Sequence, residues 1–180
     1  MRITGGKYCS RQIRCPKGVI RPAMDRMRES MFSILGNIDD LSFLDLFCGS
    51  GIVGLEAASR GADPVYFVEM DRIKKNVLHE NVMIAENTET KIFIMSAERF
   101  ISAAKEKFDL VFLDPPFPLK NKIKLVELVC EKDILNENGL LMIHHPSEEK
   151  WPESIGNILL DDRRKYGRSI LLFYRKQAAV

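Results

Sequence analysis

Asp45-Leu46-Phe47-Cys48-Gly49-Ser50-Gly51-Ile52-Val53-Gly54 is the stretch that sets the fold class of this chain. Its three glycines match the pattern G-x-G-x-x-G, in which glycine permits a sharp turn and lets a ligand approach the backbone. An apolar run leads into this loop and a helical pattern follows it, so the free N–H groups of the helix point at the ligand. The stretch therefore predicts a strand, a cofactor-binding loop and a helix.

Two acids near the loop indicate which cofactor it binds. Glu69 ends the next apolar run, where a carboxylate can accept hydrogen bonds from both ribose hydroxyls. This pattern is shared by dinucleotides and S-adenosylmethionine. Asp45 favours S-adenosylmethionine, because a carboxylate before the loop would repel a pyrophosphate and attract a methionine ammonium. We predict that the cofactor is held by Asp45, Phe47, Gly49, Ser50, Gly51, Glu69, Met70, Ser96 and Ala97.

A second motif, Asp114-Pro115-Pro116-Phe117, follows the apolar run that ends at Leu113. The two prolines fix two φ angles and remove two N–H groups, so the carbonyl of Pro115 is held beside the carboxylate of Asp114. Two adjacent acceptors suit an –NH2 group, and Phe117 offers a flat face on which a base can stack. We predict that Asp114, Pro115, Pro116 and Phe117 form the catalytic turn for methyl transfer to a planar amino group.

Strand and helix patterns alternate around these motifs. Strand-like runs lie at 43–47, 65–68, 91–95, 109–113 and 139–145, and helical patterns at 51–60, 71–86, 97–104 and around 123–130. This alternation predicts parallel pairing with right-handed crossovers. The last two runs, 158–162 and 169–174, are too close for a helix between them and should form an antiparallel hairpin. We therefore expect an α/β sheet that is mostly parallel and has an antiparallel last strand.

The length of 180 residues suits a single domain, 1–180, with an N-terminal hairpin-helix extension (1–38) and a catalytic core (39–180). Residues 1–28 carry eight Lys and Arg and one acid, a net charge of +7, whereas the remainder carries −5. A basic arm on an acidic body indicates a polyanionic partner, although a solubilising tail is the alternative. Because the glycine loop lies outside this arm, we expect cofactor binding not to depend on it.

The four cysteines form no Cys-x-x-Cys pair, and no histidine lies at zinc-ligand spacing, so we predict reduced thiols and no metal site. The first residues lack the apolar region of a signal peptide. No run reaches the roughly 18 apolar residues of a membrane span. These features predict a cytoplasmic protein without a membrane partner.

Over nearly its whole length the chain resembles the bacterial 16S ribosomal RNA guanine-N2 methyltransferases, a class I S-adenosylmethionine-dependent family. The similar motifs are Arg2-Ile3-x-Gly5-Gly6-Lys7-Tyr8, Arg21-Pro22-x-x-Asp25-Arg26-x-Arg28-Glu29, Leu44-Asp45-Leu46-Phe47-x-Gly49-Ser50-Gly51, Gly54-Leu55-Glu56-Ala57-x-Ser59-Arg60-Gly61-Ala62, Phe67-Val68-Glu69, Asn81, Phe108 to Phe117, Tyr166-Gly167 and Phe173-Tyr174.

The resemblance implies a seven-stranded Rossmann-like sheet of order 3-2-1-4-5-7-6 with the seventh strand antiparallel. It also implies cofactor binding by Asp45, Gly49, Gly51 and Glu69 and activation of a guanine N2 amine by the turn that begins at Asp114. The implied partner is 16S ribosomal RNA within a small-subunit assembly particle, gripped by basic residues 2–28 of a monomeric enzyme.

The chain departs from the family pattern at three places. Ser96 stands where an acid is usual, which weakens its expected contact with the adenine amino group, and Ala23-Met24 replaces residues that are commonly Thr. His144-His145 lies where the family often has Glu followed by His or another polar residue. Because no partner cluster is evident in the sequence, we expect these two histidines to be strand-end residues without a catalytic role.

Other functions fit parts of the pattern. Methylation of adenine N6 in DNA or another RNA uses the same acid-Pro-Pro-aromatic turn, but the chain leaves little room for a DNA-recognition domain. A Rossmann dehydrogenase is disfavoured by Asp45 and by the Pro-Pro turn. An RNA-binding module with a vestigial pocket is disfavoured because Asp45, Glu69 and Asp114 are all present.

Overall fold

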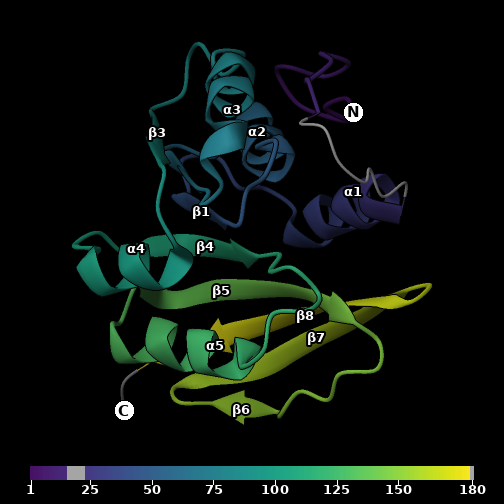
Figure 1. Ribbon diagram of the computed structural model, residues 1–180. Helices are drawn as coiled ribbons and strands as arrows, with labels where there is room; N and C mark the ends of the chain where they lie inside the picture. Colours follow the sequence, from purple (N-terminus) through teal and green to yellow (C-terminus); the bar gives the residue numbers. More distant parts are fainter. Residues whose placement is uncertain (16–22, 179–180) are drawn as a thin grey trace.

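A computed structural model describes residues 1–15 and 23–178 (Figure 1). The elements follow in the order α1 (Ala23–Leu35), β1 (Phe43–Leu46), α2 (Ile52–Ser59), β2 (Val65–Val68), η1 (Arg72–Lys74), α3 (Lys75–Val82), β3 (Thr90–Phe93), α4 (Ala97–Ala103), β4 (Phe108–Leu113), α5 (Lys122–Glu131), β5 (Leu135–Pro146), β6 (Ser154–Ile155), β7 (Ile158–Tyr166) and β8 (Ser169–Lys176). The predicted alternation of strands and helices is confirmed.

The strands form one eight-stranded sheet of order β3-β2-β1-β4-β5-β8-β7-β6. Strands β1 to β5 pair in parallel, and β8 lies antiparallel between β5 and β7. The predicted order 3-2-1-4-5-7-6 is confirmed, with β8 and β7 in the places of the seventh and sixth strands. The added strand is β6, whose two residues pair with β7 and are too few to give a sequence pattern.

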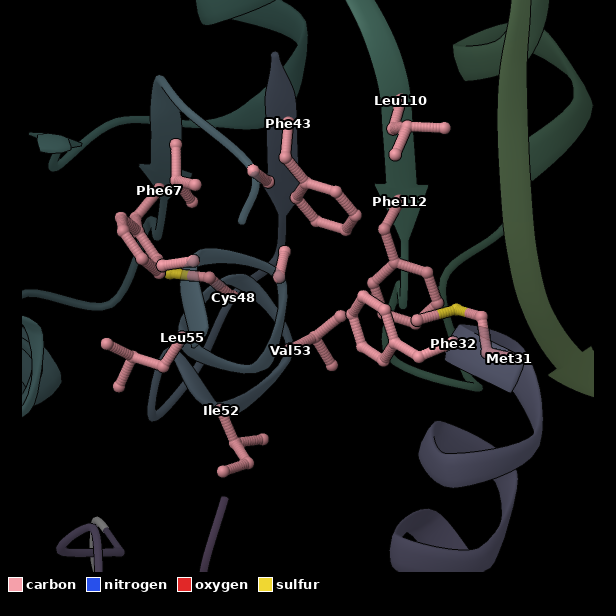
Figure 2. Close-up of a cluster of buried hydrophobic side chains, with 14 of the residues drawn as sticks. Met31, Phe32, Phe43, Cys48, Ile52, Val53, Leu55, Phe67, Leu110 and Phe112 are labelled. Carbon is pink, nitrogen blue, oxygen red and sulfur yellow. The ribbon is translucent and has the colours of Figure 1, made fainter. Parts of the chain in front are cut away.

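Two hydrophobic clusters cover the two faces of the sheet, as the alternation of side chains along each strand requires. Phe43 on β1 packs into the first cluster with α1, α2 and α3, where Figure 2 shows it beside Phe112 and Phe32. Leu44, the next residue, packs into the second cluster with α4 and α5. The molecule thus has helices on both faces, and the carboxyl ends of β1 to β4 are left at one edge.

Three elements have an end that lies four residues from its predicted position. Helix α3 stops at Val82, earlier than the predicted 86. Strand β5 begins at Leu135, which pairs with Phe108 before a shift in register, and the polar residues after Leu135 gave no strand signal. Strand β7 continues to Tyr166 through charged residues. Most of these residues are not buried, and the strand is stabilised here by its backbone pairing with β8.

The N-terminal segment is not a regular hairpin. A single antiparallel bridge joins Arg2 and Gln12, and Ile3, Tyr8 and Ile13 are buried in the first hydrophobic cluster. Division into an extension (1–38) and a core (39–180) within one domain stays a prediction, and this shared cluster supports a single folding unit. None of the helices in the part of the chain that the structure describes is long and apolar enough to cross a membrane.

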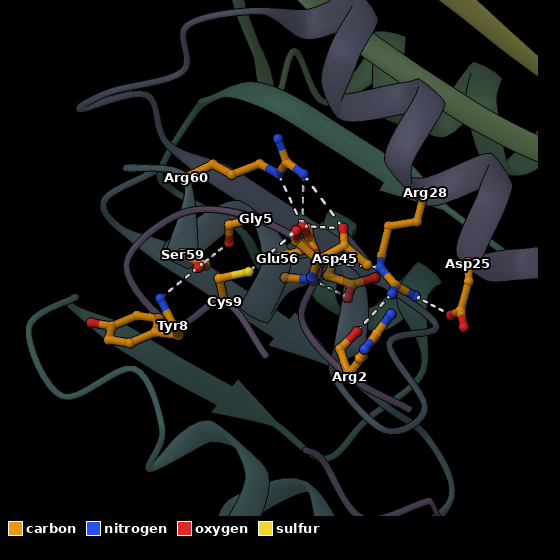
Figure 3. A network of polar contacts seen from close by, with 12 residues as sticks. Arg2, Gly5, Tyr8, Cys9, Asp25, Arg28, Asp45, Glu56, Ser59 and Arg60 are labelled. Carbon is orange, nitrogen blue, oxygen red and sulfur yellow. Dashed lines mark hydrogen bonds and ion pairs between the residues drawn. The ribbon is translucent and has the colours of Figure 1, made fainter. Parts of the chain in front are cut away.

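A buried polar network fixes the arm and α1 to α2 (Figure 3). Arg28 of α1 has a fully buried side chain and donates to Glu56 of α2, which is also fully buried (Nε–Oε2 3.2 Å). Arg28 also donates to the carbonyl of Arg2 (2.9 Å) and to Asp25 (2.9 Å). Glu56 accepts the backbone N–H and the hydroxyl of Thr4 as well. The arm is therefore part of the packed structure.

This network corrects one expectation. The resemblance groups Arg28 with the residues that grip RNA, but its guanidinium is buried and bonded internally. Asp25, in the first turn of α1, pairs with Arg28. Lys17 and Arg21, two further residues of the predicted basic arm, lie outside the described residues.

Candidate active site

The glycine loop joins β1 to α2 as predicted. Phe47 leaves the strand with a positive φ of 64°, an uncommon conformation for a residue with a side chain, and Gly51 starts α2 with a φ of 80°. A Cβ on Gly54 would lie 2.3 Å from the ring of Phe67, so glycine lets α2 pack directly on β2. These positions explain why the loop needs glycine at 51 and 54.

Asp45 is buried at the carboxyl end of β1 beneath this loop. Its Oδ2 accepts the N–H of Gly54 (3.0 Å), whereas its Oδ1 is buried without a hydrogen-bond partner among the described residues. Burial raises the pKa of Asp45 well above its usual range, the Gly54 hydrogen bond opposes this, and the charges of Asp114 and Glu69 raise it further. A cation placed beside Asp45 would stabilise its ionised form and partner the free oxygen.

Glu69 lies directly after β2 and organises the neighbouring loops. Its Oε2 accepts the N–H of Gly49 (2.9 Å), and its Oε1 accepts the N–H of Asp71 (2.8 Å). Lys74 lies 3.3 Å from the same carboxylate. The side chain of Met70 is 65% exposed beside it. Glu69 therefore lies at the rim of the site and is hydrogen-bonded directly to the glycine loop.

Ser96 and Ala97 follow β3 at the same edge. The hydroxyl of Ser96 accepts the N–H of Arg99 (3.3 Å) and so caps α4, and Ala97 is buried as its first residue. A serine hydroxyl retains further hydrogen-bonding capacity, so its predicted adenine contact stays a prediction. Ser50 is buried in the glycine loop, and its carbonyl accepts a hydrogen bond from Asn81 (2.9 Å).

The Asp-Pro-Pro-Phe turn lies at the carboxyl end of β4, next to β1. Leu113 pairs with Leu46, and the N–H of Asp114 points at the carbonyl of Leu46 (3.5 Å). Pro115 is buried and Pro116 exposed. The carbonyl of Phe117 accepts a hydrogen bond from buried Lys122 (3.0 Å). The fold therefore brings the predicted catalytic turn beside Asp45.

The structure adds one residue that sequence reasoning placed outside the site. His144, near the end of β5, lies with its Nδ1 2.7 Å from Oδ1 of Asp114, and its ring meets that of Phe117 edge-on (centroids 5.6 Å apart). The expectation that it lacks a partner is wrong. The sequence placed both residues near the ends of neighbouring parallel strands, because Asp114 follows the run 109–113 and His144 lies near the end of the run 139–145, but only the structure shows that their side chains meet. His145 points elsewhere, with its Nδ1 donating to the carbonyl of Pro146.

The residues present fit a cationic cofactor. Three carboxylates, on Asp45, Glu69 and Asp114, lie along the carboxyl ends of β1, β2 and β4, and one buried oxygen of Asp45 needs a partner. S-adenosylmethionine carries an ammonium and a sulfonium, which match this charge, whereas a pyrophosphate does not. Within residues 1–15 and 23–178, no group of three or more His, Cys, Asp or Glu is arranged to hold a metal ion.

The sheet order, the antiparallel β8 and the glycine loop after β1 define the fold of the class I methyltransferases. Residues 1–175 match the family described as "Conserved hypothetical protein 95", and the chain belongs to that family.

Individual relatives cover almost the whole chain. YlbH of Bacillus subtilis strain 168 is 32% identical over 183 residues, covering 98% of this chain and 100% of YlbH. "Ribosomal RNA small subunit methyltransferase D" of Escherichia coli strain K12 is 29% identical over 180 residues, covering 99% of this chain and 91% of that protein. The solved structure of yhhF from Escherichia coli superimposes with a TM-score of 0.88 at 29% identity and 99% coverage of both chains.

Proposed function

We propose that this protein is an S-adenosylmethionine-dependent methyltransferase that modifies the exocyclic N2 amine of a guanine in 16S ribosomal RNA. The observation that carries the proposal is the position of the Asp114 turn. It lies beside Asp45 on the adjacent strand, so a group that accepts hydrogen bonds from an amine borders the carboxylates that suit a cationic cofactor. The relatives named for small-subunit ribosomal RNA support RNA as the substrate class.

The residues of the turn have separate tasks in this reaction. The carboxylate of Asp114 and the carbonyl of Pro115 accept the two amine hydrogens, which draws the nitrogen lone pair out of conjugation with the ring. Phe117 supplies a stacking face for a base that has left its own stack. Rigid positioning of this kind can lower a barrier by up to about 7–11 kcal/mol.

S-adenosylmethionine, when bound, supplies a methyl group activated by a positively charged sulfur. The residues that would hold it are Asp45, the glycine loop that includes Gly49 and Gly51, and Glu69. This methyl group would be transferred to the amine nitrogen, which would lose one proton in exchange. The amine proton, which becomes acidic as the bond forms, passes to Asp114, whose side chain is 24% exposed and can release it to water.

The exposed basic residues of the arm form the RNA contact in this proposal. Arg2, Lys7 and Arg26 are exposed, whereas Arg11 and Arg14 are exposed but paired with Glu86 and Glu80. We further propose that the enzyme acts as a monomer in the cytoplasm, on a partly assembled small-subunit particle. Such a particle can present one guanine in a defined conformation.

The test is nucleoside analysis of 16S RNA by mass spectrometry, from cells with and without this protein. It is paired with in vitro methylation of free 16S RNA and of small-subunit particles by the purified protein. N2-methylguanosine that disappears in the deletion strain and forms in vitro is expected. N6-methyladenosine as the product, or binding of NAD but not S-adenosylmethionine in calorimetry, would overturn the proposal.

A further inference from the structure

The contact between His144 and Asp114 joins two strand ends at the centre of the site. Asp114 follows β4 and His144 lies near the end of β5, and the Nδ1–Oδ1 distance is 2.7 Å. The imidazole is 3% exposed, whereas the carboxylate is 24% exposed. The histidine thus supports the acid from the protein interior, and the acid lies between it and the open side of the site.

The chemistry of the two groups fixes where one proton lies. An ionised carboxylate can only accept, so Nδ1 of His144 must donate. In the neutral imidazole the proton therefore resides on Nδ1, and Nε2 carries a lone pair. The hydrogen bond occupies Oδ1 of Asp114 and leaves Oδ2 for another donor.

His144 also contacts the aromatic residue of the same turn. Its ring lies edge-on to Phe117, with centroids 5.6 Å apart at an interplanar angle of 60°. One buried side chain thus contacts both the group expected to accept the amine hydrogen and the ring expected to stack on the base. A contact of this kind sets the geometry of the two groups relative to each other.

We propose that His144 is a positioning residue for amine methylation: its Nδ1–H orients the carboxylate of Asp114 toward the amine, and its ring sets the position of Phe117. This inference rests on the proposed function.

Other charged groups lie near the pair of His144 and Asp114. Asp45 and, beyond it, Glu69 lie on the side of β1 and β2, and the charge of Asp114 acts on Asp45. His145 follows on β5, and the ion pair of Lys122 and Glu149 lies near it. On the side of β8, the residue opposite His144 is the apolar Leu171.

Three variants test the inference in a methylation assay with RNA. His144→Phe keeps a ring against Phe117 but removes the donor, and we expect kcat to fall about 10–100-fold, as it does when the orienting hydrogen bonds around metal ligands are removed. His144→Asn places an amide N–H where Nδ1 was. We expect it to retain most of the activity.

The matched control is His145→Asn, the same substitution one residue further on. It can keep the hydrogen bond to Pro146, so kcat should stay that of the wild type. The dissociation constant for S-adenosylmethionine should be unchanged in all three variants. Equal kcat in His144→Phe and wild type would overturn the inference, as would equal losses in His144→Phe and His144→Asn.

A measurement that needs no substrate completes the test. Long-range ¹H–¹⁵N NMR reports the tautomer of each of the three histidines, with assignment from the two Asn variants. We expect neutral His144 to carry its proton on Nδ1, the nitrogen that faces Asp114. A proton on Nε2 in an active enzyme overturns this inference alone. Inactive wild-type protein with the proton on Nδ1 overturns the proposed function while the hydrogen bond stands.

Discussion

The residues of the site are dominated by carboxylates with little opposing charge. Asp45 and Asp114 face the site without a Lys or Arg partner among the described residues, and Glu69 is paired with Lys74 at 3.3 Å. The burial that raises the pKa of Asp45 means that its ionised form is unfavourable until a cation is present. At this scale the carboxylates suit a positively charged ligand and the amine of the proposed reaction.

Asp114→Asn should leave the fold and cofactor binding nearly intact and reduce methyl transfer at least about a hundredfold. The amide still accepts a hydrogen bond but cannot take the amine proton. Single-turnover methylation and calorimetry with S-adenosylmethionine measure the two effects. Asp161→Asn, which weakens an exposed pair with Arg175, is the control. Full activity of Asp114→Asn would remove this acid from the reaction.

Glu69→Ala should weaken binding of S-adenosylmethionine by about 10–100-fold, because the ribose hydroxyls would be without charged hydrogen bonds of roughly 1.5–3 kcal/mol. Part of the effect comes from Gly49, whose N–H is held by Glu69 in the structure. Calorimetry gives the dissociation constant, with the exposed Glu89→Ala as control. An unchanged constant would place Glu69 outside the cofactor site.

Among the elements, α2 joins two parts of the molecule. Its N-terminus is the cofactor loop, and Glu56 in its middle holds the arm and α1. Asn81 of α3 makes a second link, since its amide donates to the carbonyls of Arg14 (2.8 Å) and Ser50 (2.9 Å). The arm that is expected to meet RNA is thus bonded to the loop that is expected to hold the cofactor.

Arg28→Met should destabilise the protein by about 3–5 kcal/mol, because it leaves the buried charge of Glu56 without this partner. Arg14→Met is the matched control: the same change in an ion pair whose side chains are 75% and 53% exposed, with an expected destabilisation of about 0–1 kcal/mol. Urea unfolding measures both. Equal destabilisation by the two variants would show that the buried network does not stabilise the arm.

Asn81→Ala should raise the dissociation constant for S-adenosylmethionine about tenfold, or about 1.4 kcal/mol, because the carbonyl of Ser50 would be without its donor. Deleting residues 1–15 should act in the same direction, contrary to the expectation from sequence that cofactor binding does not depend on the arm. Calorimetry measures both, with the exposed Asn76→Ala on the same helix as control. Unchanged affinity for S-adenosylmethionine in both variants would show that cofactor binding by the glycine loop does not depend on the arm.

Across the whole molecule, charge is divided between a basic N-terminal region and an acidic remainder. The structure shows that part of the basic charge serves internal contacts through Arg28, Arg11 and Arg14. The exposed cations that make no ion pair with another described residue are the ones expected to contact phosphates. Lys7 and Arg26 belong to this group.

Replacing Lys7 and Arg26 with Gln should weaken the dependence of RNA affinity on salt. The negative slope of log affinity against log salt should decrease in magnitude by roughly 0.7–0.9 for each phosphate that is no longer neutralised. Stability should change little, because both side chains are exposed. Binding titrations at several salt concentrations give the slope. Lys105→Gln with Lys132→Gln, an equal change of charge elsewhere on the surface, should leave the slope unchanged; equal slopes in both double variants would refute the RNA contact by the arm.

The mostly parallel α/β sheet and the edge that holds the site could be predicted from the pattern of the sequence, whereas the strand order was implied by the resemblance to the methyltransferase family. Alternating strands and helices permit few parallel arrangements, because crossovers are right-handed and ligands bind at the carboxyl ends of strands. Glu69 and Asp114 each follow a predicted strand, and Asp45 lies near the carboxyl end of another, so their meeting at one edge could be predicted. Their roles toward cofactor and amine stay predictions of the same reasoning.

The pairs of side chains that meet across that edge and beneath it became evident only from the tertiary structure. His144 and Asp114 are 30 residues apart, and Arg28 and Glu56 are 28 apart. No local pattern marks such pairs, because a histidine or arginine looks the same in sequence whether it is solvated or buried against a carboxylate. Packing of α1 and the arm on α2, and the register of β4 and β5, bring them together.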